Sequence, residues 1–222
     1  MTWVKICGMT NLEDALVAAD AGADAVGFVF YEKSPRCVTL ERVREIVQKL
    51  PAKVDKVGVF VNEPPDRVSA VADDAGLTAV QFHGDEYRSP ERYSLGGKLL
   101  FCLPVVGLLR EMRGQTGSFL GIPKLPEGAG VLLDSGNHEQ RGGTGRTFAW
   151  GEAHEFVAVL KKLYPVVIAG GLCSSNVGWA VEYLRPWGVD VVSGVEASPG
   201  KKDPEKVRAF VRAVREMDQK VS

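Results

Sequence analysis

This sequence of 222 residues has almost no excess of positive or negative charge, and its apolar runs are short. The 27 lysines and arginines are balanced by 28 aspartates and glutamates, for a formal net charge of −1, which argues against a basic nucleic-acid-binding protein. The longest apolar stretch, Leu99 to Leu109, is interrupted by Pro104 and is far shorter than the ~20 residues that a membrane span needs. The start, MTWVKICGMT, lacks the basic segment and long apolar run of a secretory signal. We therefore expect a cytoplasmic protein with no nucleic-acid or membrane partner.

Cysteine pairs and clusters of metal ligands are also lacking. The 4 cysteines form no C-x-x-C pair, and the histidines and carboxylates are not spaced to hold a metal ion. We expect reduced thiols rather than disulfides or a zinc site. No G-x-G-x-x-G follows the first apolar run, so the usual marker of a dinucleotide site is missing as well.

Short apolar runs alternate with amphipathic segments along the whole chain, and this alternation predicts the fold. Eight runs are predicted as strands: Val4–Cys7, Ala25–Phe30, Lys56–Val61, Ala79–Phe82, Lys98–Leu103, Gly130–Leu133, Val166–Ala169 and Asp190–Ser193. The segments between them begin with residues that favour helix starts: Asn11, Thr39, Pro64-Pro65, Ser174-Ser175 and Asp203-Pro204. Eight such units predict an α/β protein, a single (β/α)8 or TIM barrel over residues 1–222, rather than an open doubly wound sheet.

The repeat is weakest between Ser89 and Gly128, around the fourth and fifth helices. The segment SPERYSLGG is a poor helix former, and GQTGSFLGIPKLPEG is broken by glycine and proline. We expect an irregular region there, with a short or irregular fourth helix and a long loop before the sixth strand.

Active sites of such barrels lie at the carboxyl ends of the strands, where this chain has few residues for acid-base chemistry. The candidates that follow the strands are Cys7, His83, Asp134 and Glu196. For His83 we favour a structural role at the strand end over a substrate contact. Because side chains alternate along a strand, a Cys7 that points into the barrel mouth places Lys5 in the barrel interior. A buried lysine needs a carboxylate partner, and either Glu196 or Asp190 could supply it.

Glycine is abundant, with 25 residues, and glycines follow the seventh and eighth apolar runs in IAGG and SGVE. Gly170, Gly171 and Gly194 thus stand where barrels of this kind bind phosphate on backbone N–H groups, which predicts a phosphorylated small-molecule ligand. The alternative, that these glycines only relieve crowding at strand ends, is equally compatible with the sequence. A third glycine cluster, from Arg141 to Arg146, either covers the site or forms a surface turn.

Segments spread over nearly the whole chain resemble one known family. In order they are KICGMTNLEDA, GFVFYEKSPRCV, GVFVN, VQFHGDE, LLDSGN, RGGTGRTFAW, IAGGL and DVVSGVEASPGKKD. Together and in this order they resemble the phosphoribosylanthranilate isomerase family of tryptophan biosynthesis. The stretch from Tyr87 to Gly128 carries no clear motif.

The resemblance implies a TIM barrel that converts N-(5-phosphoribosyl)anthranilate to 1-(o-carboxyphenylamino)-1-deoxyribulose 5-phosphate, an Amadori rearrangement, with no cofactor and no metal. A general acid protonates the ribose ring oxygen, and a general base removes the proton of the adjacent sugar carbon. On the family's motifs Cys7 is the base, Asp134 is the acid and Arg36 holds the anthranilate carboxylate. The phosphate contacts map onto Gly170, Gly171, Ser193 and Gly194.

Each of these side chains also has an ordinary structural interpretation. Cys7 is compatible with a packing thiol, Asp134 with a turn cap, and Arg36 with an exposed ion pair. The chemistry makes demands as well. Cys7 needs a cation or oriented amides to become a thiolate at neutral pH, and Asp134 needs burial or a nearby anion to keep its proton.

The sequence lacks the residues that would indicate other phosphate-binding barrel enzymes. An indole-glycerol-phosphate synthase would need a catalytic lysine at a strand end, and a ribulose-phosphate epimerase would need histidine and aspartate metal ligands; neither pattern is present. A non-catalytic phosphosugar-binding barrel would have no need for both Cys7 and Asp134. The sequence is compatible with a monomer and with a homodimer.

Overall fold

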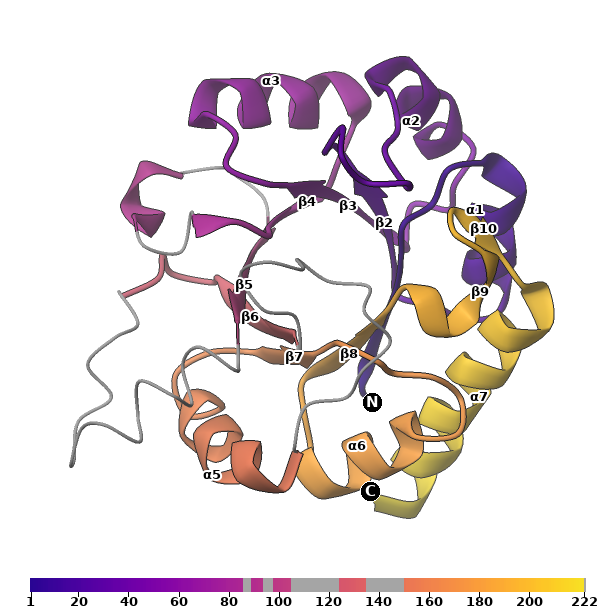
Figure 1. Cartoon of the computed structure of the whole chain (residues 1–222), viewed down its shortest axis with the longest axis vertical. Helices are drawn as coiled ribbons and strands as arrows, with labels where there is room; N and C mark the ends of the chain where they lie inside the picture. The colour runs from indigo at the N-terminus through magenta and orange to yellow at the C-terminus, as the bar shows by residue number, and fades with distance from the viewer. Residues whose placement is uncertain (86–88, 94–97, 105–123, 135–149, 222) are drawn as a thin grey trace.

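Eight parallel strands close into a barrel at the centre of the structure (Figure 1). The computed structural model describes residues 1–85, 89–93, 98–104, 124–134 and 150–221. The strands follow one another round the barrel in chain order, and β1 (Trp3–Cys7) pairs with β8 (Gly188–Val191) to close it. The predicted TIM barrel is confirmed.

The predicted strands are all present, and the largest difference is at β8, which begins and ends two residues earlier than predicted. The strands between β1 and β8 are β2 (Ala25–Val29), β3 (Asp55–Phe60), β4 (Ala79–Phe82), β5 (Lys98–Pro104), β6 (Gly130–Asp134) and β7 (Val166–Ile168). The surrounding helices are α1 (Leu12–Asp20), α2 (Leu40–Val47), α3 (Pro65–Ala75), α5 (Trp150–Leu160), α6 (Val177–Leu184) and α7 (Pro204–Val221). After β8, a 3₁₀ turn η3 (Ser193–Val195) leads into a small antiparallel pair, β9 (Glu196–Ser198) and β10 (Lys201–Lys202).

Polar side chains begin the helices where the sequence predicts starts. Asn11, Thr39 and Asp203 each accept a hydrogen bond from the backbone N–H three residues further along, which partners a group the helix leaves unpaired. Helix α6 begins at Val177, just after the predicted Ser174-Ser175, and the Asn176 side chain accepts from the Cys173 backbone N–H instead of capping the helix.

The irregular region is confirmed in part. In the described part of the connection between β4 and β5 the chain forms a short 3₁₀ helix, η2 (Pro90–Arg92). Pro90 suits a helix start, but the serine and glycines that follow favour no continuation. The predicted loop before the sixth strand falls mostly on residues 105–123, which lie outside the described residues.

Alternation along the strands separates two apolar regions. Outward side chains such as Val4, Ile6 and Phe28 are fully buried between the barrel and its helices. Inward side chains at the amino-terminal end of the barrel form a separate apolar layer that includes Leu100, Leu132 and Val167. Further up the strands the buried residues include polar ones: Lys5, Gln81, Asp134 and Asp190. The apolar layer therefore fills one end of the barrel, and the polar side chains that can take part in chemistry lie toward the other end.

The two ends of the chain meet beside the barrel seam. The Asp218 carboxylate near the end of α7 accepts hydrogen bonds from the backbone N and the hydroxyl of Thr2, at 2.9 and 2.6 Å. Among the helices described, none combines the length and the apolar character that crossing a membrane requires.

Candidate active site

One pocket at the carboxyl ends of the strands brings together four of the predicted site residues: Cys7, Arg36, His83 and Asp134. The rest of its lining consists of Val29, Tyr31, Ser34, Val59, Val61, Gln81, Asp190 and Val192. Polar and titratable side chains thus converge here beside four valines, as in a site for a polar small molecule. Lys5 and Glu196 do not line this pocket, but each is bound to a residue that does.

Cys7 ends β1 and is 4% exposed. Burial raises the pKa of its thiol, because the thiolate loses its hydration. The Lys5 ammonium acts in the opposite direction, without bringing the pKa of Cys7 down to its ordinary value. In the free protein Cys7 is therefore mainly a thiol at neutral pH, and nearby cations decide how readily it becomes a base.

Lys5 lies inside the barrel, as strand alternation predicts. It is fully buried, and its Nζ donates a hydrogen bond to Asp190 Oδ1 at 2.9 Å across the seam between β1 and β8. Burial by itself lowers the pKa of Lys5, but the interactions with Asp190 and Cys7 together outweigh it, and the pKa stands above its ordinary value. The predicted orientation is confirmed, and of the two partners considered for Lys5 the structure selects Asp190.

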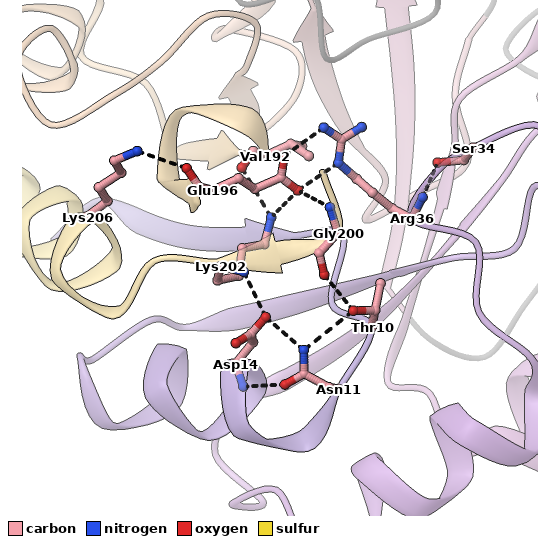
Figure 2. Close-up of polar contacts among 10 residues, drawn as sticks. All are labelled: Thr10, Asn11, Asp14, Ser34, Arg36, Val192, Glu196, Gly200, Lys202 and Lys206. Carbon is pink, nitrogen blue, oxygen red and sulfur yellow. Dashed lines mark hydrogen bonds and ion pairs between the residues drawn. The ribbon is translucent and has the colours of Figure 1, made fainter. Parts of the chain in front are cut away.

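Glu196, the other carboxylate considered for Lys5, binds Arg36 instead. Arg36 donates from Nε and Nη2 to Glu196 Oε1 and Oε2 at 2.8 and 2.7 Å, a bidentate pair (Figure 2). The side chains are only 14% and 5% exposed, so this is not the exposed ion pair that an unremarkable loop arginine would form. Hydrogen bonding to Glu196 raises the pKa of Arg36. No described residue accepts a hydrogen bond from the remaining terminal nitrogen, Nη1.

Lys202, on β10, is a second cation bound to Glu196. Its Nζ donates to Glu196 Oε1 at 3.2 Å and to the Val192 carbonyl at 3.1 Å, and the side chain is almost fully buried. Its backbone N–H donates to Asp14 Oδ2 at 2.8 Å, at the start of α1. Figure 2 shows the resulting chain of contacts from α1 through the β9–β10 pair to Arg36. Arg36 is thus fixed by segments far apart in the sequence.

Asp134, which ends β6, faces His83 across the pocket. The distance from His83 Nε2 to Asp134 Oδ2 is 3.9 Å. His83 Nδ1 lies 3.2 Å from the Gln81 amide nitrogen, and an amide N–H that donates to Nδ1 leaves the imidazole proton on Nε2, toward Asp134. Cys102 contacts the same ring, with 3.8 Å between Sγ and Nε2. The contacts of His83 are compatible with both roles considered for it.

The predicted phosphate residues lie in two loops that contact each other beside this pocket rather than within its lining. Gly170 and Gly171 adopt φ values of 83° and 66°, which favour glycine. A Cβ added to Gly194 would lie 1.9 Å from the Leu172 carbonyl oxygen, so the loops after β7 and β8 approach this closely only with glycine there. Ser193 begins η3 between Gly194 and the pocket residue Val192.

Gln81 and Lys202 belong to the site but are not among the residues predicted from the sequence, and Asp190 is predicted only as a partner for Lys5. Gln81 and Asp190 lie within strands, and alternation reveals them as it reveals Lys5, because Gln81 stands two residues before His83. The Gln81 side-chain oxygen is buried and has no hydrogen-bond partner among the described residues. Lys202 belongs to the segment GKKD, in which exposed lysines are the ordinary expectation.

Two expectations concern loops and metals. The glycine cluster from Arg141 to Arg146 lies outside the described residues. Over the ranges that the structure does describe, no group of three or more His, Cys, Asp or Glu side chains is arranged to hold a metal ion.

The chain is similar over nearly its whole length to proteins of one kind. The family model described as N-(5'phosphoribosyl)anthranilate (PRA) isomerase matches residues 4–213. The N-(5'-phosphoribosyl)anthranilate isomerase of Pelobacter propionicus is 44% identical over 217 residues, which cover 97% of this chain and 97% of that protein.

Solved structures give the same result. A phosphoribosyl anthranilate isomerase in complex with reduced 1-(o-carboxyphenylamino)-1-deoxyribulose 5-phosphate is 36% identical, with a TM-score of 0.75, and the match covers 97% of this chain and 100% of that one. A structure of monomers generated from the dimeric enzyme of Thermotoga maritima is 38% identical, with a TM-score of 0.75 and the same coverage.

Proposed function

The chain belongs to the N-(5'-phosphoribosyl)anthranilate isomerase family and is an isomerase of tryptophan biosynthesis, and from that premise we propose how its residues carry out the Amadori rearrangement. The substrate is N-(5-phosphoribosyl)anthranilate and the product is 1-(o-carboxyphenylamino)-1-deoxyribulose 5-phosphate. The observation that supports the proposal is the meeting of Cys7 and Asp134, from the non-adjacent strands β1 and β6, in one pocket.

Asp134 is the general acid in this proposal. It gives its proton to the ribose ring oxygen as the bond from that oxygen to carbon 1 breaks, and the anthranilate nitrogen forms a Schiff base with carbon 1. Asp134 is buried in the pocket, at 8% exposure, where the ring oxygen of a bound substrate can reach its carboxyl group.

Cys7 is the general base. Its thiolate takes the proton from carbon 2, and the electrons of that bond form the double bond of an enolamine while the Schiff base nitrogen becomes neutral. The enolamine then gains a proton at carbon 1 and loses its hydroxyl proton, which yields the ketone. Proton gain and proton loss are equal over the reaction, as an isomerisation requires.

Arg36 holds the anthranilate carboxylate. Glu196 occupies the side of the guanidinium formed by Nε and Nη2, which leaves the terminal side, Nη1 with the second Nη2 hydrogen, for another carboxylate. A substrate bound there would have its anthranilate group anchored near Cys7, since Arg36 and Cys7 line the same pocket. The backbone of Gly170, Gly171, Ser193 and Gly194 receives the phosphate.

Turnover of freshly prepared N-(5-phosphoribosyl)anthranilate tests these roles. We expect Cys7→Ser and Asp134→Asn each to lower kcat by about 10²- to 10⁴-fold, the usual contribution of a positioned acid or base. Cys37→Ser and Asp20→Asn change an exposed thiol and an exposed carboxylate and are the matched controls. Near-normal turnover by Asp134→Asn, or an inactive wild type, would show the proposal to be wrong.

Organisation and location are proposals of the same kind. We propose that residues 1–222 form one domain, which the pairing of β1 with β8 and of Thr2 with Asp218 supports. A cytoplasmic location suits a catalytic thiol that must stay reduced. Both a monomer and a homodimer are compatible with the site, and the Thermotoga maritima relative is described as dimeric. Sedimentation of the purified protein distinguishes the two states.

A further inference from the structure

The interior of the barrel beneath the pocket holds a charged pair that the mechanism above does not use. Lys5 and Asp190 are both buried, and taking such a pair out of water is costly. An apolar pair of similar volume would fill the space at least as well for stability. Lys5 does not line the pocket, so it has no direct contact with a ligand there.

The Lys5 ammonium has N–H groups that Asp190 does not accept from, and it lies near the Cys7 sulfur. An ammonium has three N–H groups, and Asp190 is the only oxygen acceptor for Nζ among the described residues. Lys5 is 0% exposed, so water outside the barrel cannot take the other donors. The Cys7 thiol stands two residues along β1 on the same inward face, where charge interaction with the Lys5 ammonium favours the thiolate.

The neighbouring strand is shaped to let these two side chains converge. Gly27 on β2 is the register partner of Cys7. A Cβ added to Gly27 would lie 2.6 Å from Cys7 Sγ and 3.1 Å from Lys5 Cε, so the thiol and the lysine chain both lean over the space that this glycine leaves empty. The sulfur and the lysine side chain therefore lie over the same glycine, side by side on the inner face of the barrel.

We propose that Lys5 is a positioning residue for the reaction, which holds a positive charge beside the Cys7 sulfur so that Cys7 can act as a thiolate, with Asp190 as the counter-ion that keeps this lysine protonated. The inference rests on the role of Cys7 proposed above and supplies the cation which that role demands.

Other charged groups also face Cys7 and act on its titration. Lys202 from β10 and Arg36 from the loop after β2 are cations that interact with Cys7, but both are bound to Glu196, which offsets their charge. Asp190 from β8 opposes ionisation of the thiol directly. His83 and Asp134 line the opposite part of the pocket. Lys5 has the largest favourable influence on the thiolate.

The test follows the pH dependence of Cys7 alkylation by iodoacetamide, with the modified peptides quantified by mass spectrometry. The exposed Cys37 thiol of the same molecules is the internal reference. We expect Lys5→Met to move the Cys7 midpoint upward by about one pH unit or more, as loss of an opposite charge within ~4–6 Å does, and to lower kcat at least tenfold near neutral pH.

Lys5→Met leaves Asp190 buried without its partner and risks misfolding, so Lys5→Met/Asp190→Asn is the second variant. It removes both charges, and we expect it to unfold at a temperature close to that of the wild type yet to keep a raised Cys7 midpoint and a lowered kcat. A folded double variant with the wild-type midpoint and kcat would overturn the inference and leave Lys5 a structural residue. Retained turnover in Cys7→Ser would instead refute the proposed base, whatever the Lys5 variants do.

Discussion

The surroundings of Cys7 (the base wall) and those of Asp134 (the acid wall) differ in the charges that they contain. Around Cys7, three cations act on the sulfur: Lys5, Lys202 and Arg36. On the other wall, Asp134 is buried and faces the His83 imidazole, which is oriented by the Gln81 amide. Cations favour the anionic form of a base such as the Cys7 thiol, whereas the described group that faces the Asp134 carboxylate is an imidazole. The difference teaches that the two groups stand in unlike surroundings, which agrees with the proposed roles of Cys7 as base and Asp134 as acid.

The largest effect on kcat is expected from replacing Asp134, the proposed acid. Asp134→Asn keeps the shape of the side chain but has no acidic proton, so we expect kcat to fall by about 10²- to 10⁴-fold. Substrate affinity should change much less, because Arg36 and the glycine loops are untouched. Steady-state kinetics measure both quantities. A large rise in KM with unchanged kcat would show that Asp134 binds substrate and does not transfer a proton.

Substitution of Arg36 should weaken substrate binding more than it slows the chemical step. Arg36→Lys keeps the positive charge but loses the two-sided fork that serves Glu196 and the substrate carboxylate. We expect KM to rise roughly 10- to 100-fold, the equivalent of one charge-assisted hydrogen-bonded pair, with a smaller change in kcat. An unchanged KM would contradict the proposed carboxylate site.

Glu196 connects the cations of the base wall, and its loss should lower stability. Glu196→Gln leaves Arg36 and Lys202 without their carboxylate, at a cost of roughly 1–3 kcal/mol. Urea unfolding of the variant and the wild type at neutral pH measures the difference. Equal free energies of unfolding would mean that the bidentate pair contributes nothing net.

The same carboxylate makes a pH-dependent contribution. Burial alone would raise the pKa of Glu196, but the Arg36 and Lys202 contacts hold it below its ordinary value of 4.5. A group whose pKa is lowered on folding stabilises the folded state above its unfolded pKa, and the stabilisation is lost as the pH falls through the folded value. The difference in unfolding free energy between wild type and Glu196→Gln should therefore shrink below pH ~4.5. A difference that grows with acidity would contradict this pKa direction.

The smallest effect is expected at an exposed ion pair used as a reference. Arg42 and Glu45 lie 3.1 Å apart on the surface of α2, with exposures of 47% and 64%. Arg42→Ala should lower stability by less than about 0.5 kcal/mol, because water screens such a pair. The comparison with Glu196→Gln, under the same unfolding conditions, isolates the effect of burial.

The sequence predicts the barrel and the inward residues of β1 because both follow from local regularities. Apolar runs separated by caps such as Asn11 indicate the strands and helices, and alternation indicates that Lys5 lies inside if Cys7 does. The partners of Arg36 are different. Glu196 stands 160 residues away along the chain and reaches Arg36 only because the β9–β10 pair folds back beside the barrel mouth. No periodicity in the sequence indicates that hairpin. The burial of Lys202 and its contact with Glu196 depend on the hairpin, so the sequence does not predict them either.

A deuterium isotope effect at carbon 2 of the ribosyl group tests the division of labour between the two walls most directly. With substrate deuterated at that carbon, Cys7→Ser should show a larger isotope effect on kcat/KM than the wild type, because removal of that proton becomes the slow step. Asp134→Asn should show an effect close to one, because ring opening becomes slow instead. Equal isotope effects in the two variants, or the reverse order, would contradict the assignment of Cys7 as the base and Asp134 as the acid.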